Sequence, residues 1–307
     1  MTKISRMVLG TMVLKLNKLD FSFKLLDDAM KRGICTFDTA KVYGDSEYVL
    51  GKWIAERKNR DKIVILTKGA HHNDVRKRVT PFDIMSDLYD SLAKLQTDYI
   101  DIYMLHRDDE TKPVSEIMDT LNKLYDDKLI LNIGVSNWTT ARIREANEYA
   151  KKNNLQEIKF ISPQFSVARQ VLNPWGTDNS DCVAADDEMI NYCEDNNIQM
   201  LTFSSLARGF MSGAFKHNEK EKAMEILDKF AQRGYFHEEN LERLKRVEVL
   251  ANEKNLTVPQ TALSYVMSKS DKIHPIFTAM NEKEMDENIA SKSIKLTSEE
   301  CNWINLK

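Results

Sequence analysis

The sequence has few cysteines, and they lack the spacing of a metal site. The 307 residues contain only four of them: Cys35, Cys182, Cys193 and Cys301. None forms a CxxC pair, so a zinc cluster is not expected, and free thiols in a reducing cytosol are the simplest interpretation. The histidines also lack metal spacing, and the adjacent His71 and His72 are interpreted as part of a polar loop.

Long apolar runs and an excess of charge are missing as well. No apolar run approaches the roughly 20 residues that span a bilayer, and residues 1–12 lack the layout of a signal peptide. The 44 Lys and Arg nearly balance the 47 Asp and Glu, which leaves no strong field for nucleic acid or anionic lipid. Since 42% of the residues are hydrophobic, we expect a folded, cytoplasmic protein with neither nucleic acid nor membrane as a partner.

Short apolar runs alternate with longer amphipathic stretches along the chain. Eight such runs occur, at residues 6–12, 33–39, 62–68, 99–106, 129–136, 158–164, 198–205 and 274–280. Their lengths and β-branched residues suit buried parallel strands, and the stretches between them have helical periodicity. One helix is expected to begin at Thr80, a capping residue followed by Pro81. The pattern predicts an α/β fold of the (β/α)₈ TIM-barrel class.

A doubly wound open sheet is the alternative arrangement. It is disfavoured because no GxGxxG motif follows the first apolar run. No low-complexity linker divides the chain, so residues 1–307 are expected to form a single domain. Two stretches, 165–185 and 207–238, are longer than ordinary loops, and long loops in a compact barrel are usually functional or mobile.

Four polar residues stand at or just after the ends of consecutive apolar runs. Asp38 ends the second run and Tyr43 follows it, while Lys68 and His106 end the third and fourth. The carboxyl ends of barrel strands converge on the active site. A nearby ammonium lowers the pKa of a tyrosine from about 10, and a carboxylate keeps that lysine charged. The residue types therefore predict a site in which Tyr43 protonates a carbonyl oxygen that His106 orients.

Several segments carry a resemblance to a known family. They are residues 37–53, 65–68, 100–109, 134–138, 162–167, 203–213 and 281–289. In order and spacing they resemble a bacterial-type branch of the aldo-keto reductase family, over almost the whole chain. The resemblance implies a barrel that binds an extended nicotinamide dinucleotide and reduces an aldehyde or ketone. It matches Asp38, Tyr43, Lys68 and His106 to the family's catalytic tetrad.

The resemblance also implies a set of cofactor contacts. Positions that match contacts to the nicotinamide are Ser136, Asn137, Gln164 and Phe203. Positions that match the loop around the pyrophosphate are Ser204, Leu206, Arg208 and Gly209, and those near the adenosine are Lys283, Glu287 and Asn288. An aromatic ring suits stacking on the nicotinamide, and a guanidinium suits a bidentate phosphate contact. No metal or flavin is expected.

The turn that reads the adenosine 2′-phosphate in the family departs here from the family pattern. Basic residues at this turn commonly favour NADP, whereas this chain has Thr278, Asn281 and Glu284. Only Lys283 supplies positive charge nearby. The family tendency favours NADP(H), and the residues themselves leave NAD(H) open.

The loops after the strands are expected to form the substrate pocket. The candidate substrate residues are Trp53, Arg107, Trp138 and Trp175, with the 165–185 loop. The polar segment 106–109 favours a polar, sugar-like carbonyl compound. Two other functions stay open: a nucleotide-sensing subunit of the potassium-channel β type, which can keep the tetrad, and a barrel isomerase or lyase.

Overall fold

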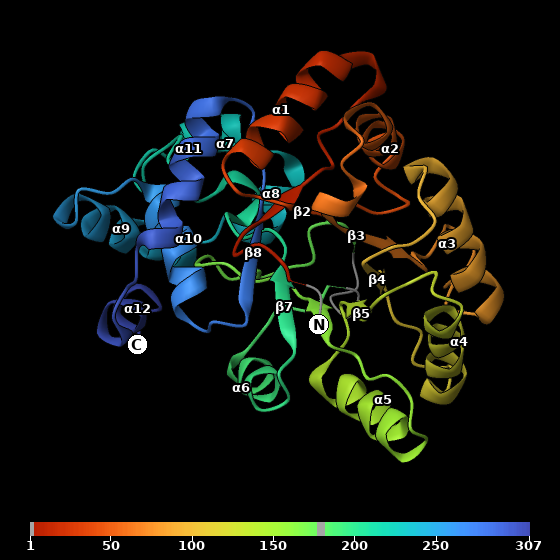
Figure 1. The fold of residues 1–307 in the computed structure, drawn as a ribbon. Coiled ribbons are helices and arrows are strands. Elements are labelled where there is room, and N and C mark those ends of the chain that lie inside the picture. Colours follow the sequence, from red (N-terminus) through yellow and green to blue (C-terminus); the bar gives the residue numbers. More distant parts are fainter. Residues whose placement is uncertain (1–2, 177–181) are drawn as a thin grey trace.

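The computed structural model describes residues 3–176 and 182–307 and contains a closed barrel of parallel strands (Figure 1). The strands are β1 Val8–Gly10, β2 Thr36–Asp38, β3 Val64–Gly69, β4 Ile102–Leu105, β5 Ile133–Ser136, β6 Phe160–Ser162, β7 Gln199–Thr202 and β8 Ile273–Phe277. Each strand pairs with the next, and β8 pairs with β1, which closes the barrel. The expected (β/α)₈ barrel is therefore confirmed, and each of the eight apolar runs overlaps a strand.

Helices surround the barrel and supply the crossover connections that parallel strands require (Figure 1). Those that follow the first six strands in turn are α1 Leu19–Lys31, α2 Ser46–Arg57, α3 Pro81–Leu95, α4 Val114–Asp126, α5 Thr140–Lys152 and α6 Asp187–Asp195. Those after β7 and β8 are α7 Lys220–Ile226, α8 Lys229–Tyr235, α9 Glu238–Glu253, α10 Val258–Ser268, α11 Glu282–Ala290 and α12 Ser298–Ile304. In the part of the chain that is described, no helix has the length and apolar character needed to cross a membrane.

The stretch 207–238, interpreted from the sequence as a long loop, contains the two helices α7 and α8. Each has only seven residues, too few for an amphipathic repeat to become visible. A side-chain cap defines the start of α8, where the Asp228 side chain accepts a hydrogen bond from the backbone N–H of Ala231. Capping at α3 follows the sequence prediction: the Thr80 side chain accepts from the N–H of Asp83, with Pro81 at the first helical position.

The buried side chains form two layers separated by the barrel wall. One cluster fills the barrel interior and consists of Val8, Val64, Leu66, Ile102, Met104, Phe160, Leu201 and Ile276. The larger cluster packs between the strands and the surrounding helices. The interior of the barrel is thus a filled core rather than a pore.

Helices α2 and α3 approach each other closely at Gly51. A Cβ atom added there would lie 2.2 Å from the carbonyl oxygen of Lys94 and 2.8 Å from the carbonyl carbon of Leu95. Backbone atoms cannot move aside as a flexible side chain can, so this contact requires glycine. The close approach fixes α3 against α2, and the connections that enter both helices carry residues of the candidate site.

We expect Gly51→Ala to lower the free energy of unfolding by about 1–3 kcal/mol, because the added methyl group overpacks the helix contact. Chemical denaturation would measure the change. Lys52→Ala, at the exposed neighbouring position, serves as the control and should stay within about 0.5 kcal/mol of the parent protein. A Gly51→Ala variant as stable as the parent would show that the two helices can separate without cost.

Candidate active site

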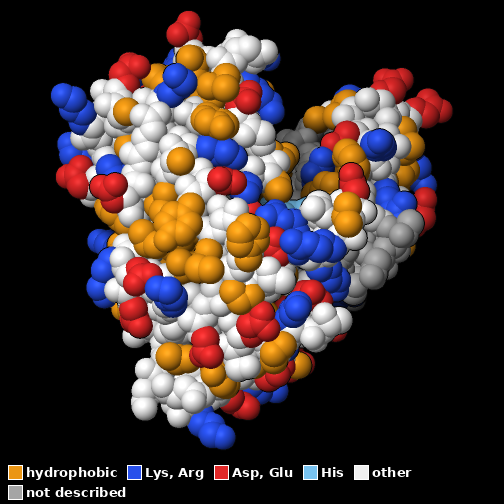
Figure 2. Space-filling model, turned by 90° about the vertical axis from the view of Figure 1, so that its right-hand side faces the viewer, with side chains coloured by type: hydrophobic (Ala, Val, Ile, Leu, Met, Phe, Trp, Pro, Cys, Tyr) orange, Lys and Arg blue, Asp and Glu red, His pale blue; other side chains and the backbone are white. Residues whose placement is uncertain are grey.

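A cavity of about 990 Å³ lies at the carboxyl ends of the strands. Figure 2 shows one face of the molecule hollowed by a notch, with Lys and Arg side chains and a histidine at its base. The sequence-predicted residues that line the cavity are Asp38, Tyr43, Lys68, His106, Arg107, Ser136, Asn137, Trp175, Phe203, Ser204, Leu206, Arg208, Gly209, Glu287 and Asn288. The fold therefore brings most of the predicted site into one space.

A buried ion pair lies on the floor of this cavity. Lys68 donates from Nζ to Oδ1 of Asp38, and to the carbonyl oxygen of Thr39 at 3.0 Å. Asp38 and Lys68 are each 3% exposed, and they lie on the neighbouring strands β2 and β3. The same ammonium lies 5.1 Å from the ring centroid of Tyr43. The ring of His106 stands edge-on to that of Tyr43, with 5.8 Å between the centroids.

The ion pair keeps Lys68 charged although it is out of water. Burial by itself lowers the pKa of Lys68, but Asp38 and Tyr43 act in the opposite direction and leave that pKa above its ordinary value. Burial raises the pKa of Asp38, and the Lys68 ammonium opposes this rise. The result is a fixed positive charge directly beside a phenol.

The Tyr43 phenol corrects one expectation from the sequence. A lowered pKa was expected from the nearby lysine, but burial raises the pKa of Tyr43 by more than the Lys68 ammonium lowers it. Tyr43 still lines the cavity, and the residue as a whole is half-buried. A phenol in this environment keeps its proton at neutral pH and can release it only to a group that gains negative charge nearby.

His106 is placed to act as a neutral hydrogen-bonding group. Burial, followed by the positive charges of Lys68 and Arg107, holds the pKa of His106 well below its usual value. Its backbone N–H donates to the carbonyl oxygen of Gly69 at 2.8 Å, which ties β4 to the end of β3. The imidazole therefore stays uncharged at neutral pH, and one ring nitrogen carries a proton to donate.

Two of the residues predicted to bind the nicotinamide, Ser136 and Asn137, are hydrogen-bonded to each other beside the tetrad. Asn137 donates from Nδ2 to Oγ of Ser136 at 3.0 Å and to the carbonyl oxygen of His106 at 3.2 Å. Phe203 lines the cavity, with Trp175 at 6.3 Å between ring centroids. Gln164 does not line the cavity; it is buried and donates from Nε2 to Oγ of Ser166 at 2.9 Å. Together, Ser136, Asn137 and Phe203 supply polar contacts and an aromatic face.

Arg208 presents a guanidinium to the same cavity from the loop after β7. It lies over the rings of Trp175 and Phe230, at 5.2 and 5.3 Å from the centroids, and donates from Nη2 to Asp228 at 2.7 Å. Its buried Nε has no hydrogen-bond partner within residues 3–176 and 182–307. A held guanidinium with an unused donor fits a phosphate group, so the donor set suits a dinucleotide.

The far end of the cavity has acidic rather than basic residues. Glu284 and Glu287 line it, whereas Lys283 is exposed and does not. Glu284 is fixed in place, since its carboxylate accepts from the Asn281 side chain at 2.8 Å and from the backbone N–H of Met280 at 2.8 Å. The expected role of Lys283 as a cofactor contact is therefore not supported by its position.

Two of the four candidate substrate residues lie away from the cavity. Trp53 is fully buried between α2 and the barrel, where it packs on Phe37 and donates from Nε1 to Asp27. Trp138 is 2% exposed and lies beneath the Arg142 guanidinium. Both assignments are wrong: Trp53 lies on the inward face of α2, and Trp138, in the segment between β5 and α5, is buried beneath Arg142. Of the 165–185 loop, residues 177–181 lie outside the described residues.

Some residues that line the cavity were missed in the sequence. They include Met12 after β1, Val42 beside Tyr43, and His71 and His72 after β3. The ring of His71 lies 4.8 Å from that of His106, at right angles to it. Their positions directly after strand ends were the available signal, but these residue types more often belong to surface loops or packing.

Comparison with known proteins adds independent evidence. The model of the Aldo/keto reductase family matches residues 6–306. Norsolorinic acid reductase of Aspergillus flavus is 27% identical over 304 residues, which cover 92% of this chain and 70% of that protein. Probable aldo-keto reductase 1 of Glycine max is 27% identical over 288 residues, covering 90% and 76%. Aldo-keto reductase YhdN of Bacillus subtilis is 29% identical over 197 residues, covering 62% and 54%.

The fold, the site and the comparisons agree with one another. The closed eight-stranded barrel matches the resemblance found in the sequence, and the cavity at its carboxyl rim contains the four residues that matched the tetrad. The family model covers nearly the whole chain, and the relatives bear the names of reductases. This protein therefore belongs to the aldo/keto reductase family of oxidoreductases.

Proposed function

We propose that this protein reduces an aldehyde or ketone to an alcohol with a nicotinamide cofactor, and that Tyr43 is the general acid. The observation that carries the proposal is the buried Lys68–Asp38 ion pair beside the Tyr43 phenol, with His106 across the cavity. The channel-subunit alternative shares this barrel, but no contact in the described residues favours it over catalysis.

Each tetrad residue has a separate task in the proposed reaction. The bound cofactor supplies a hydride to the carbonyl carbon. Tyr43 gives its proton to the carbonyl oxygen, and the Lys68 ammonium stabilises the phenolate that remains. Asp38 holds Lys68 in position and keeps it charged. Neutral His106 donates a hydrogen bond to the same carbonyl oxygen and orients it.

The cofactor would lie along the cavity from the tetrad toward α11. Ser136 and Asn137 would hold the carboxamide, and Phe203 would cover one face of the nicotinamide ring; all three line the cavity. Arg208 is the nearby cation with a donor available for the pyrophosphate. Glu287 and Asn288 line the cavity at the adenosine end.

Glu284 supports a choice between the two nicotinamide cofactors. Its carboxylate lines the cavity at the adenosine end and is held by Asn281 and Met280. A carboxylate accepts hydrogen bonds from a ribose 2′-hydroxyl and repels a 2′-phosphate. The family tendency favours NADP(H), but the charge at this turn leads us to propose a preference for NAD(H).

The substrate is proposed to be a polar carbonyl compound. Arg107, His71 and His72 line the cavity close to Tyr43 and His106, so the mouth of the site offers hydrogen-bond donors beside the reacting carbonyl. Trp175 is 44% exposed and provides an apolar face. This combination suits a compound with hydroxyl or other polar groups next to its carbonyl.

Tyr43→Phe should reduce kcat by about 10²–10⁴-fold, since it removes the proton donor. Cofactor binding, followed by fluorescence titration, should stay within about twofold because no phenol oxygen is needed for it. Tyr48→Phe is the matched control: Tyr48 lies on α2 outside the cavity and should tolerate the change. Turnover of a good substrate by Tyr43→Phe at the parent rate would exclude Tyr43 as the acid.

We expect the rate of carbonyl reduction to be level across neutral pH and to fall at alkaline pH. Because the pKa of Tyr43 is raised above 10, the phenol keeps its proton until the pH exceeds that value. Because the pKa of His106 is lowered well below 6.5, no change of its charge occurs between pH 6 and 8. The pH dependence of kcat would test this, and an inflection near pH 6.5 would contradict the assigned state of His106.

Glu284→Arg should move cofactor preference from NAD(H) toward NADP(H). We expect the ratio of kcat/KM for NADH over NADPH to exceed about 10 in the parent enzyme and to fall by at least tenfold in the variant, a change of about 1.4 kcal/mol. Glu282→Arg, on the same turn but outside the cavity lining, is the control. A parent enzyme that prefers NADPH would overturn the role given to Glu284.

A further inference from the structure

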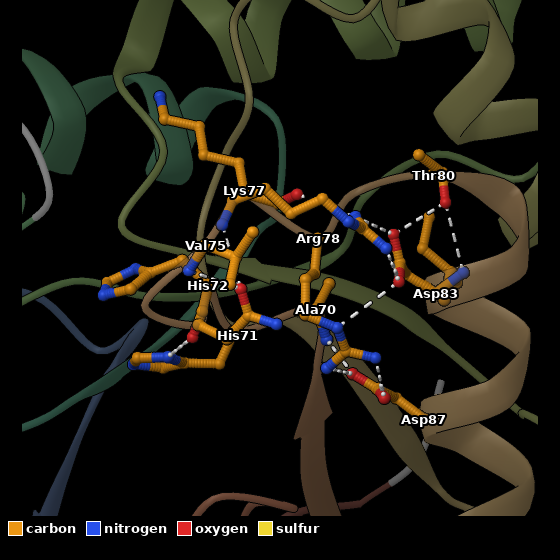
Figure 3. Close-up of polar contacts among 12 residues, drawn as sticks. Ala70, His71, His72, Val75, Lys77, Arg78, Thr80, Asp83 and Asp87 are labelled. Carbon is orange, nitrogen blue, oxygen red and sulfur yellow. Dashed lines mark hydrogen bonds and ion pairs between the residues drawn. The ribbon is translucent and has the colours of Figure 1, made fainter.

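One face of α3 joins two of the connections that build the site. Its carboxylates are Asp83, Asp87 and Asp90, and the cations that they pair with are Lys41, Arg76 and Arg78. Lys41 belongs to the connection after β2, and the two arginines belong to the connection after β3. Figure 3 shows Ala70, Arg78, Asp83 and Asp87 gathered where the chain leaves β3 and enters α3.

Asp87 is the carboxylate that contacts both connections. Its side chain is 1% exposed. Oδ1 accepts from Nζ of Lys41 and from Nη2 of Arg78 at 2.7 Å, while Oδ2 accepts from the backbone N–H of Ala70 at 2.9 Å and from Nη1 of Arg78 at 3.1 Å. Asp83 and Asp90 each contact only one of the two connections. Every acceptor direction of Asp87 is thus used by a group on a site-forming segment.

The two connections that Asp87 contacts adjoin the tetrad residues Tyr43 and Lys68. Lys41 stands two residues before Tyr43, and its backbone N–H donates to the carbonyl oxygen of Lys68 at 3.0 Å. Ala70 stands two residues after Lys68 and has a left-handed backbone, with φ of 57°. A non-glycine residue keeps that conformation only where its surroundings impose it, and the Asp87 carboxylate is the acceptor that fixes the Ala70 N–H.

The space around the end of β3 allows little adjustment. A Cβ atom on Gly69 would lie 2.8 Å from Cβ of Asp87 and 2.1 Å from Oη of Tyr103. Tyr103 in turn donates to the carbonyl oxygen of Ile84 on α3 at 3.0 Å. The helix therefore lies directly against the end of the strand that carries Lys68.

We propose that Asp87 is a positioning residue that sets the distance between the Tyr43 phenol and the Lys68 ammonium. It does so by joining the Tyr43 connection, through Lys41, to the end of β3, through Ala70. The proposal rests on the function proposed above, in which Tyr43 gives its proton beside Lys68. A displacement of about 1 Å in such a pair costs on the order of 10²-fold in rate.

Asp101, which contacts the opposite end of β3, offers a matched control for Asp87. Asp101 is also buried, and it accepts from Nη2 of Arg60 at 2.7 Å and from the backbone N–H of Ile65 in β3 at 2.9 Å. Asp101 thus combines a buried carboxylate, an arginine and a β3 amide, as Asp87 does. It stands directly before β4, beside the amino end of β3, and does not line the cavity.

The experiment compares Asp87→Asn with Asp101→Asn in the full chain, using a carbonyl substrate and NADH or its 4-deuterated form. Both changes remove one buried charge, so both should lower the midpoint of thermal unfolding. Only Asp87→Asn should lower kcat by about tenfold or more and raise the deuterium isotope effect, because transfer to the carbonyl becomes slower. KM for the cofactor should change by no more than about twofold in either variant.

The outcomes distinguish a positioning role of Asp87 from a role in the stability of the fold alone. The proposal is overturned if folded Asp87→Asn keeps kcat within about twofold, or if Asp101→Asn loses as much kcat. If Asp87→Asn does not fold, the Lys41→Met variant tests the proposal instead. Lys41 is partly exposed, so its replacement should be tolerated. Loss of Lys41 should lower kcat while the pH dependence of cofactor binding stays unchanged. Full turnover by Tyr43→Phe would show instead that the proposed function itself has failed.

Discussion

The buried pair of Lys68 and Asp38 is the interaction on which the rest of the site depends. A lysine ammonium without water around it is costly, and a carboxylate on the neighbouring strand makes that burial tolerable. Both residues stand on neighbouring strands of a closed barrel, which fixes the positions of their backbones relative to each other. The phenol and the imidazole then stand around a fixed positive charge, and their pKa values follow from it and from burial.

The balance of charge in this chain is local as well as global. The net charge of −3 conceals an uneven distribution within the cavity: cationic and histidine side chains lie around Tyr43 and His106, while carboxylates line the end formed by α11. On one face of α3, three carboxylates pair in the same way with three cations of the neighbouring connections. Buried charge is tolerated in each place because a partner lies within hydrogen-bonding distance, and each pair ties together segments that are separate in the sequence.

The barrel and the tetrad positions were accessible from the sequence because both depend on local pattern. Runs of β-branched residues with helical stretches between them specify parallel strands, and a polar residue at the end of a run falls on the rim. Both tryptophans were expected in the cavity, but the inward phase of α2 buries Trp53, and Trp138 is buried beneath Arg142 in the segment between β5 and α5. Helices α7 and α8 are too short to show a repeat.

The order of elements, the class of barrel and the residue types at each strand end are determined by the sequence, because they depend on spacing along one segment at a time. The tertiary structure alone decided which groups meet: that burial outweighs Lys68 in raising the pKa of Tyr43, that His71 faces His106, and that Asp87 joins two connections. Desolvation and contact between distant segments depend on how all the helices pack at once, and no local pattern records that.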